Sequence, residues 1–478
     1  MELGNLTISK THQGLIKKEF SALEVCQAYL EKLKKEDKKI NAFLTVTENL
    51  ALSQAKKVDE MILEGREIPI LAGIPMAVKD NMLVENIRCT AGSKILENYI
   101  APYDATVIKK LKVKGVVILG KTNMDEFAMG ASGENSAFGP TRSPHDLTRV
   151  PGGSSSGSAA VVAADMAVYA LGSDTAGSIR YPASFCGVVG LKPTYGAVSR
   201  CGLIAMASSL DQIGSLTKTV EDAKIVFEAI SGKDPLDSTS VESPKIENWK
   251  LKIGNLRIGV PKEYFVKGID PGVEKVIKQA INKYEEMGAK IEEVSLPHTE
   301  YSIATYYIIT PSEISANLAR YDGIKYGLSR LKTQDSKLRS LLDIYLESRK
   351  EGFGNEVMRR IMLGTYALSA GYYEAYYLRA QKVRTLIKRD FENVFQKANV
   401  LMTPVSPFPA FKLGEKIDNP LSMYLCDIFT APASLAGLPA ISIPCGKEKN
   451  LPVGLQIIGK PFEEGKILEV AKILERAN

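Results

Sequence analysis

Two periodicities of apolar residues divide the chain into predicted helices and predicted strands. Over residues 1–65 the apolar residues recur every three or four positions, as on one face of an amphipathic helix. Ser21 stands directly before one such stripe and is suited to be its N-cap, because a serine hydroxyl accepts a hydrogen bond from a free backbone N–H. We therefore expect residues 1–65 to be largely helical. The stripe consists of Leu23, Val25, Cys26, Tyr29, Leu30 and Leu33.

Short, continuous apolar runs predict buried strands. Residues 74–78 form the first run and lead into a turn at residues 79–81, and residues 116–119 form the second. A third strand is expected to follow a short apolar helix and to end near Gly172. Helices that alternate with short apolar strands are typical of an α/β fold built around a sheet.

The second half of the chain repeats this alternation. Strands are predicted at residues 256–260 and 290–295, with an amphipathic helix between them, and the longest helical repeat covers residues 373–394. Residues 440–459 are expected to form a hairpin around a polar turn, followed by a last helix. Residues 232–248 are polar, and we expect them to form a long surface connection between the two halves.

Composition narrows the class of protein. Of the 478 residues, 45% are hydrophobic and 24% are charged, and the net charge of +6 arises from 61 basic and 55 acidic residues. This small excess favours a mixed, solvated surface over a dedicated nucleic-acid face. No stretch approaches 18 apolar residues and no signal peptide is recognised, so we expect a chain that is neither exported nor membrane-spanning. Six widely separated cysteines indicate reduced thiols of a cytoplasmic protein, without a zinc or disulfide framework.

Two turns rich in serine and glycine, at residues 152–158 and 174–180, carry the candidate chemistry. The first has the glycine spacing of a phosphate-binding loop, but Ser158 stands where that loop requires lysine. It also matches the hydrolase motif G-x-S-x-G around Ser155, yet no apolar strand precedes it, and His298 is the only histidine downstream. A flexible linker is also a poor interpretation, because apolar helix and strand signals follow at once.

A serine nucleophile in this chain therefore needs a base other than histidine. A lysine can serve when it is uncharged, which requires its pKa to fall from about 10.4 to near 7, a change of roughly 4 kcal/mol. Such a lysine should lie at the end of a buried strand. Lys79 follows the predicted strand at residues 74–78 and fits this requirement, although a purely structural lysine beside Asp80 fits the same pattern.

The combination of Lys79 with these two turns resembles the amidase signature family. Further resemblance lies in "NMDEFAMGASGENSAFGPTRSP", "LKPTYGAVSRCGLIAMASSLDQIG" and "EGFGNEVMRRIMLGTYALSAGYYEAYY". It implies one large α/β amidase-signature fold over residues 1–478, with a central mixed twisted β-sheet covered by helices on both faces. Residues 1–65 would form N-terminal helices, 66–231 the catalytic core and 232–478 the half that shapes the substrate pocket.

The resemblance implies a Ser-Ser-Lys triad. Ser178 would be the acyl-enzyme nucleophile, Ser154 the bridging serine after a cis peptide bond from Gly153, and Lys79 the terminal base. Backbone N–H groups of the second turn would form the oxyanion hole, where losing one donor costs about 10²–10³ in rate. These groups belong to Thr175, Ala176, Gly177 and Ser178.

Two positions depart from the family pattern. Ala176 stands where many relatives have glycine, and we expect it to have an ordinary φ, with Gly177 taking any unusual dihedral angle. Ser156 replaces a common glycine and is expected to be a small surface filler.

The implied substrate is glutamine, whose charged ends need a cation and an anion near the nucleophile. By resemblance, Arg360, in preference to Arg359, would bind the carboxylate and Asp427 the ammonium group. Either Tyr306 or Tyr307 would close the pocket, and Gly130 and Ser132 would also contact substrate. No metal site is expected.

The segments are most similar to a branch of the family that supplies ammonia for converting Glu-tRNA(Gln) into Gln-tRNA(Gln). This implies a partner B subunit, which binds the tRNA and activates it with ATP and Mg²⁺, and a small C subunit, with no cofactor on this chain. Two alternatives stay open: a stand-alone amidase for another small amide, and a non-catalytic scaffold that retains the fold.

Overall fold

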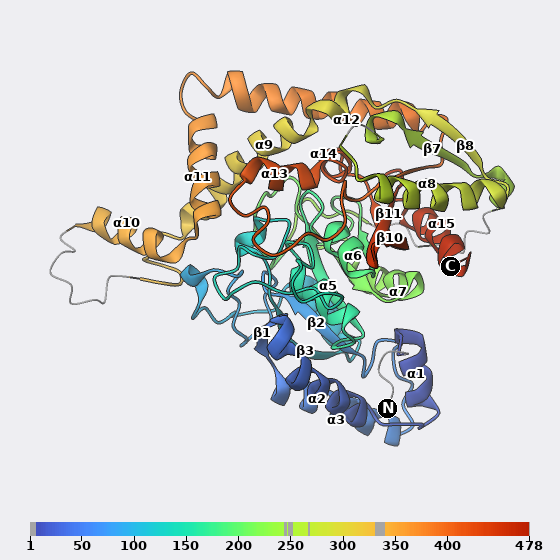
Figure 1. Ribbon diagram of the computed structural model, residues 1–478. Helices are drawn as coiled ribbons and strands as arrows, with labels where there is room; N and C mark the ends of the chain where they lie inside the picture. The colour runs from blue at the N-terminus through green and yellow to red at the C-terminus, as the bar shows by residue number, and fades with distance from the viewer. Residues whose placement is uncertain (1–5, 243–245, 247–251, 266–267, 330–339, 478) are drawn as a thin grey trace.

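A single mixed β-sheet of 11 strands runs through the described part of the chain, and helices pack around it (Figure 1). The computed structural model describes residues 6–242, 246, 252–265, 268–329 and 340–477. This arrangement confirms the expected α/β fold with a central mixed sheet. The division of the chain at residues 65 and 231 stays a prediction.

The strands of this sheet lie in the order β1-β3-β2-β4-β6-β5-β10-β11-β9-β7-β8. Neighbours are parallel within β3-β2-β4 and within β9-β7-β8, and antiparallel elsewhere. The strands are β1 (Phe43–Val46), β2 (Pro75–Lys79), β3 (Val117–Thr122), β4 (Tyr169–Asp174), β5 (Val189–Lys192), β6 (Gln212–Thr217), β7 (Arg257–Pro261), β8 (Lys290–Val294), β9 (Val400–Pro404), β10 (Ala440–Glu448) and β11 (Leu451–Ile458).

The predicted helices are present, and the structure adds helices that the repeats did not predict, including the long ones at Val220–Ile230, Ser302–Asn317, Leu341–Gly352 and Asn355–Ala367. A π-helical turn, Glu374–Leu378, precedes α12 and interrupts the longest predicted repeat. The α-helices are α1 (Ile8–Ile16), α2 (Ala22–Ile40), α3 (Glu48–Leu63), α4 (Thr106–Val113), α5 (Ser156–Ala163), α6 (Arg180–Cys186), α7 (Val220–Ile230), α8 (Pro271–Glu286), α9 (Ser302–Asn317), α10 (Leu341–Gly352), α11 (Asn355–Ala367), α12 (Arg379–Val394), α13 (Pro420–Tyr424), α14 (Ala431–Leu435) and α15 (Glu464–Ala477).

Helix α2 shows how local sequence fixes an element. Ser21 accepts a hydrogen bond from the Glu24 N–H at 3.0 Å, and the Glu24 carboxylate accepts one from the Ser21 N–H at 2.8 Å. This capping box satisfies two backbone donors that the first turn leaves free. The predicted stripe faces the core, except that Leu23 is only half-buried.

The three parallel strands β3, β2 and β4 position the site. Their residues are all buried, and β2 lies between the other two. Because the strands are parallel, their carboxyl ends meet at one edge of the sheet, where Lys79 pairs with Thr122 and where β4 ends at Asp174. The second serine-rich turn begins where β4 ends, whereas the first lies 30 residues after the end of β3, at the start of α5.

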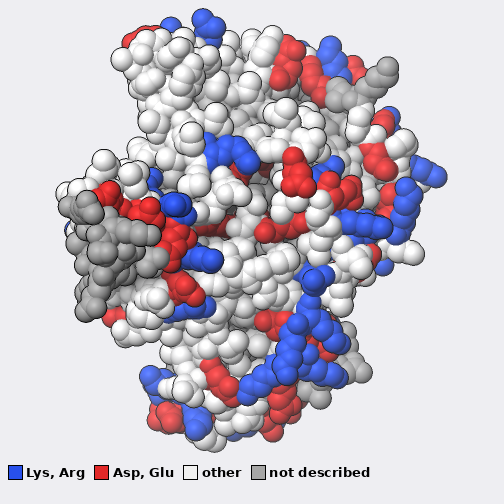
Figure 2. Space-filling view, turned by 60° about the vertical axis from the view of Figure 1, so that its left-hand side comes forward, with Lys and Arg blue, Asp and Glu red and all other residues white. Residues whose placement is uncertain are grey.

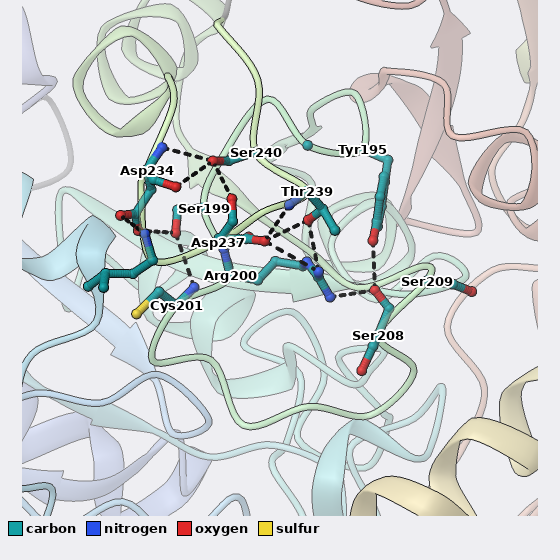
Figure 3. Close-up of polar contacts among 12 residues, drawn as sticks. Tyr195, Ser199, Arg200, Cys201, Ser208, Ser209, Asp234, Asp237, Thr239 and Ser240 are labelled. Carbon is teal, nitrogen blue, oxygen red and sulfur yellow. Dashed lines mark hydrogen bonds and ion pairs between the residues drawn. The ribbon is translucent and has the colours of Figure 1, made fainter.

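The described part of the polar segment after α7, residues 232–242, is mostly exposed, as expected of a surface connection, but buried residues anchor it to the rest of the fold. Asp234 and Asp237 are buried. Asp234 accepts a hydrogen bond from the Ser199 hydroxyl at 2.6 Å, and Asp237 accepts one from the Arg200 N–H at 2.8 Å (Figure 3). Residues 243–245 and 247–248 of that expectation lie outside the described residues.

Basic and acidic side chains are intermingled over most of the face in Figure 2, with one patch of Lys and Arg at its lower right. Within the described ranges, no helix is long and apolar enough to cross a membrane. All six cysteines are free thiols, and five of them are buried; Cys201 is half-buried.

Candidate active site

Lys79 ends the buried strand β2 and is itself fully buried. Its Nζ donates hydrogen bonds to the hydroxyls of Ser154 at 2.8 Å and Ser155 at 2.9 Å. A third acceptor, the Ser173 carbonyl oxygen on β4, lies at 3.3 Å. The amine is therefore directed at the first serine-rich turn, and its geometry fits a proton acceptor for Ser154.

The environment of Lys79 favours the neutral amine. Burial lowers the pKa of Lys79 from an ordinary value of 10.5 to about 7, although the nearby carboxylates of Asp125, Asp174 and Asp211 act in the opposite direction. No carboxylate forms an ion pair with Lys79 in the described residues. By contrast, the equally buried Lys121 is paired with Asp80 at 2.9 Å, and the pKa of Lys121 is raised. Near neutral pH a substantial fraction of Lys79 is uncharged and able to accept a proton.

The bridging serine is fixed by a loop wrapped around Asp125. The structure has a cis peptide bond between Gly153 and Ser154, as the resemblance implied. The Gly153 N–H donates to the Ala131 carbonyl oxygen at 2.7 Å, and Asp125 accepts hydrogen bonds from the N–H groups of Gly133 and Asn135. The first turn is thus packed tightly against the loop at residues 130–135.

Replacing Gly153 with alanine should disrupt this packing. A Cβ atom at position 153 would lie 2.1 Å from Asp125 Oδ2 and 2.8 Å from the Gly133 backbone nitrogen. We expect the free energy of unfolding to fall by about 1–3 kcal/mol, the usual cost of overpacking, together with a loss of any activity that depends on Ser154. Thermal unfolding of Gly153→Ala beside Gly254→Ala tests this, because a Cβ at position 254 meets nothing within 4 Å. Equal melting temperatures for the two variants would contradict the prediction.

The second turn is anchored by a buried ion pair. Arg180 Nη2 lies 2.9 Å from Asp174 Oδ1, and both side chains are fully buried. Asp174 also accepts a hydrogen bond from the Ile179 N–H at 3.1 Å. Burial alone would raise the pKa of Asp174, but the Arg180 guanidinium outweighs it and holds this pKa below its ordinary value. The turn that carries Ser178 is therefore fixed at both of its ends.

The same turn exposes backbone donors beside Ser178. Among the described residues, no protein group accepts a hydrogen bond from the N–H groups of the four predicted donors, Thr175, Ala176, Gly177 and Ser178. Such donors are suited to bind a developing oxyanion. The φ of Ala176 is not positive, as expected, and Gly177 has no positive φ either. Gly177 is needed for space, because a Cβ there would lie 2.3 Å from Thr430 Oγ1.

Asp211 supports the second turn at Thr175. The sequence analysis did not predict a role for Asp211. The Thr175 hydroxyl donates a hydrogen bond to Asp211 Oδ1 at 2.7 Å. Asp211 Oδ2 accepts from the N–H groups of Met206 and Ala207 at 2.8 and 3.1 Å. Burial raises the pKa of Asp211 to about 6, against the effect of these hydrogen bonds. Near neutral pH this carboxylate is thus available to orient Thr175.

The structure brings the two serine turns together but leaves one link of the expected relay unmade. Ser178 is 8% exposed, and its carbonyl oxygen accepts a hydrogen bond from the Ser155 N–H at 3.1 Å. Within the described part of the chain, the hydroxyls of Ser154 and Ser178 share no hydrogen bond. The step between these two serines stays a prediction for the substrate-loaded enzyme.

Ser155 is a contact of the lysine that sequence reasoning missed. Besides accepting from Lys79, its hydroxyl donates to the Ser173 carbonyl oxygen at 3.1 Å. Its position next to Ser154 is the one sequence signal that could have suggested this role. The expectation for Ser156 is wrong: this serine is fully buried at the start of α5, where its hydroxyl donates to the Asn123 carbonyl oxygen at 3.4 Å.

The residues expected to bind the ends of glutamine lie together. Arg360 on α11 is 3% exposed, whereas the side chain of Arg359 is 43% exposed, in accord with the preference for Arg360. The Tyr307 hydroxyl donates to Asp427 Oδ2 at 2.8 Å, and the Arg360 guanidinium lies 5.2 Å from the centre of the Tyr307 ring. Burial raises the pKa of Asp427 to about 6, although Tyr307 and Arg360 lower it. Tyr307 therefore links the cation to the anion.

Tyr306 does not take part in this link. It is buried, and its ring packs edge-on against Tyr307 with centroids 5.0 Å apart. Ser132 is also buried and accepts a hydrogen bond from the Glu134 N–H at 3.3 Å. Gly130 lies against Asp125, where a Cβ would come within 2.3 Å of the carboxyl carbon. Of the two tyrosines, the geometry favours Tyr307.

A cavity of about 620 Å³ lies beside Gly130 and Arg360. The described residues of its wall do not include Lys79, Ser154, Ser178 or Asp427. In the described ranges, no group of three or more His, Cys, Asp or Glu residues is placed to hold a metal ion. The wall includes Gly130, Glu134, Glu356, Arg359, Arg360 and Tyr424.

Comparison with known proteins defines the class to which this fold and site belong. The sequence model of the family described as Amidase matches residues 24–468, which is most of the chain. The chain therefore belongs to the amidase signature family. Its sequence is 58% identical over 480 residues to the A subunit of glutamyl-tRNA(Gln) amidotransferase from Caldanaerobacter subterraneus subsp. tengcongensis, covering 100% of this chain and 97% of that protein.

Solved structures show the same relationship. The crystal structure of the A subunit of glutamyl-tRNA(Gln) amidotransferase from Thermotoga maritima matches with a TM-score of 0.80 and 46% identity, over 98% of this chain and 94% of that one. The native peptide amidase from Stenotrophomonas maltophilia matches with a TM-score of 0.82 and 29% identity, over 100% of this chain and 97% of that one. The fold is thus shared by proteins that bear different names, an amidotransferase subunit and a peptide amidase.

Proposed function

We propose that this chain hydrolyses glutamine and supplies the ammonia as the A subunit of a glutamyl-tRNA(Gln) amidotransferase. The observation that carries the chemistry is the contact of 2.8 Å between the buried Lys79 amine and the Ser154 hydroxyl. Support for this place in the complex comes from full-length relatives that bear the corresponding name. Support for glutamine comes from Arg360 and Asp427, which both contact Tyr307.

In the proposed mechanism the Ser178 hydroxyl attacks the carboxamide carbon of glutamine. Its proton passes to Ser154, while Ser154 gives its own proton to neutral Lys79. The oxygen of the amide becomes an oxyanion and is bound by the N–H groups of Thr175, Ala176, Gly177 and Ser178. Collapse of this intermediate breaks the C–N bond, and the proton returns through Ser154 to the leaving ammonia.

A γ-glutamyl ester on Ser178 is then left in the site. Water attacks the ester carbonyl carbon, Ser154 and Lys79 take the proton of that water, and the ester bond breaks. Ser178 recovers its proton and glutamate leaves. No step requires a cofactor on this chain. In the proposed complex a B subunit holds Glu-tRNA(Gln) and activates it with ATP and Mg²⁺, and a small C subunit joins the assembly in the cytoplasm.

The two alternative functions make different demands on the site. A stand-alone amidase for another small amide without charged ends has no need for a buried cation beside a buried carboxylate. A non-catalytic scaffold has no need to keep a buried lysine against two serine hydroxyls. The contacts of Arg360, Asp427 and Lys79 therefore favour the glutaminase.

Substitution of Arg360 tests the substrate. We expect Arg360→Ala to reduce kcat/KM for glutamine by about 10²-fold, mainly through KM, because a charge-assisted bidentate contact of roughly 1.5–3 kcal/mol is lost. The measurement is ammonia release by the complex, with the exposed Arg66→Ala as a matched control. Hydrolysis of neutral amides but not of glutamine by the unmodified complex would contradict the proposed function.

A further inference from the structure

Glu356 makes a network of contacts that the proposed mechanism does not use. It lies on α11 one turn before Arg360, and its side chain is 11% exposed. Its Oε1 accepts hydrogen bonds from Arg360 Nε at 2.7 Å and from the Tyr424 hydroxyl at 2.9 Å. Its second oxygen is paired with Arg359. One carboxylate therefore joins α11 to α13 at the wall of the cavity.

These contacts leave the other edge of the Arg360 guanidinium free. Among the described residues, neither terminal nitrogen of Arg360 donates a hydrogen bond to protein. The Tyr307 and Tyr424 rings stack with centroids 3.9 Å apart, and the guanidinium carbon lies 5.2 and 5.4 Å from those centroids. The guanidinium is thus restrained at Nε and supported by aromatic rings. Its two terminal NH₂ groups stay available for the bidentate contact that suits a carboxylate.

A comparison within the chain separates this arrangement from an ordinary helix ion pair. On α8, Glu274 and Lys278 have the same four-residue spacing and lie 2.6 Å apart, but their side chains are 32% and 58% exposed. Such exposed ion pairs contribute little to the stability of the fold. Glu356 and Arg360 are 11% and 4% exposed, and Glu356 has a third partner on another element, Tyr424.

The charges around Glu356 are also consistent with a carboxylate subsite. Glu356 contacts two arginines, Arg359 and Arg360, so this group of three carries a net positive charge. The cavity wall as a whole is acidic, with Glu126, Glu134, Glu351, Glu356 and Asp418 against Lys94, Arg359 and Arg360. The attraction for a carboxylate is therefore local to the two arginines that Glu356 contacts. Glu356 can orient the cation without cancelling it.

We propose that Glu356, assisted by Tyr424, is a positioning residue that sets the Arg360 guanidinium for the α-carboxylate of the substrate and so determines selectivity for α-amino acid amides. This inference rests on the proposed function. Glu356 acts through Arg360 and does not touch the reacting atoms. Its loss should therefore affect substrates that carry an α-carboxylate and spare those without one.

The test compares glutamine with 4-aminobutanamide, which is glutamine without its α-carboxylate. Ammonia release is measured with the complete complex carrying Glu356→Ala, Glu356→Gln or Tyr424→Phe. Glu274→Ala is the matched control, because it removes the corresponding glutamate of the exposed pair. Binding of both compounds to the same variants in a Ser178→Ala background gives a second readout that does not depend on turnover.

We expect Glu356→Ala to raise KM and Kd for glutamine about tenfold to a hundredfold, the equivalent of one hydrogen bond to a charged group. The value of kcat for glutamine should change less than about threefold. The values of KM and Kd for 4-aminobutanamide should also change less than about threefold. Glu356→Gln should recover most of the loss, since its amide oxygen can still accept from Arg360 Nε. Tyr424→Phe should give a smaller loss of the same selectivity.

Two results would overturn the inference: equal losses for both amides in Glu356→Ala, which indicate a collapsed pocket, or no loss for glutamine. Failure of the proposed function is distinct, because the unmodified complex would then release no ammonia from glutamine. The binding measurement decides the role of Glu356 even in that case. Unchanged selectivity between the two compounds in Glu356→Ala would contradict the positioning role, and a loss of selectivity would support it.

Discussion

Replacing Ser178 with alanine is expected to reduce ammonia release from glutamine on the order of 10⁴–10⁶-fold, because the proposed nucleophile is removed. The fold should be retained, since among the described residues the Ser178 hydroxyl makes no hydrogen bond to protein. Ser215→Ala is the matched control, because Ser215 is buried on β6 and its hydroxyl has no hydrogen-bond partner among the residues that the structure describes.

A rapid acid quench followed by mass spectrometry identifies the residue that carries the acyl group. We expect a γ-glutamyl ester on the peptide that contains Ser178, and none in Ser178→Ala. A label on Ser155 would contradict this assignment and restore the G-x-S-x-G interpretation of the first turn. Equal ammonia release by the unmodified chain and Ser178→Ala would also remove Ser178 as the nucleophile.

Replacing Lys79 with methionine should reduce the rate by about 10⁴-fold, the upper end of the range for a general base. The fold should not lose stability at pH 7. The pKa of Lys79 is lowered from 10.5 to about 7, so between these values the unfolded chain binds the proton more tightly than the folded one. The resulting penalty on folding is largest below pH 7 and fades as the pH rises toward 10.5. Methionine removes this penalty.

Activity and melting temperature of Lys79→Met separate a base from a structural lysine. An inactive variant with an unchanged or higher melting temperature at pH 7 fits the proposed role. A variant that unfolds at much lower temperature would support a lysine that merely caps β2. A variant that keeps most of its activity would exclude Lys79 as the base.

The sequence predicts elements best where a local pattern is repeated. The stripe of α2 and the apolar run of β2 each combine periodicity with a clear end signal, Ser21 before the helix and a polar turn after the strand. The same local pattern identified Lys79. A base with a lowered pKa must be buried, and the residue that ends a buried strand is itself buried. The order of the 11 strands depends on contacts between distant segments, which a single sequence does not reveal.

Contacts between remote segments also explain what the sequence did not show in the site. Tyr424 and Glu356 are 68 positions apart, and Tyr307 and Asp427 are 120 apart. Sequence pattern alone left Tyr306 and Tyr307 equivalent. They are distinguished by the hydrogen bond that Tyr307 donates to Asp427. Ser156 looked like a surface residue because serines in glycine-rich turns are usually exposed, but here α5 begins within the core.

A titration of the Lys79 side chain tests the central claim, a neutral amine in the active site, most directly. Lysine-selective NMR of the complex, with the Lys79 signal assigned from its absence in Lys79→Met, follows the protonation of Nζ as the pH is raised. We expect a midpoint near pH 7, coincident with the rise of kcat/KM for glutamine. An Nζ that stays charged up to pH 9 while the enzyme is fully active would contradict it.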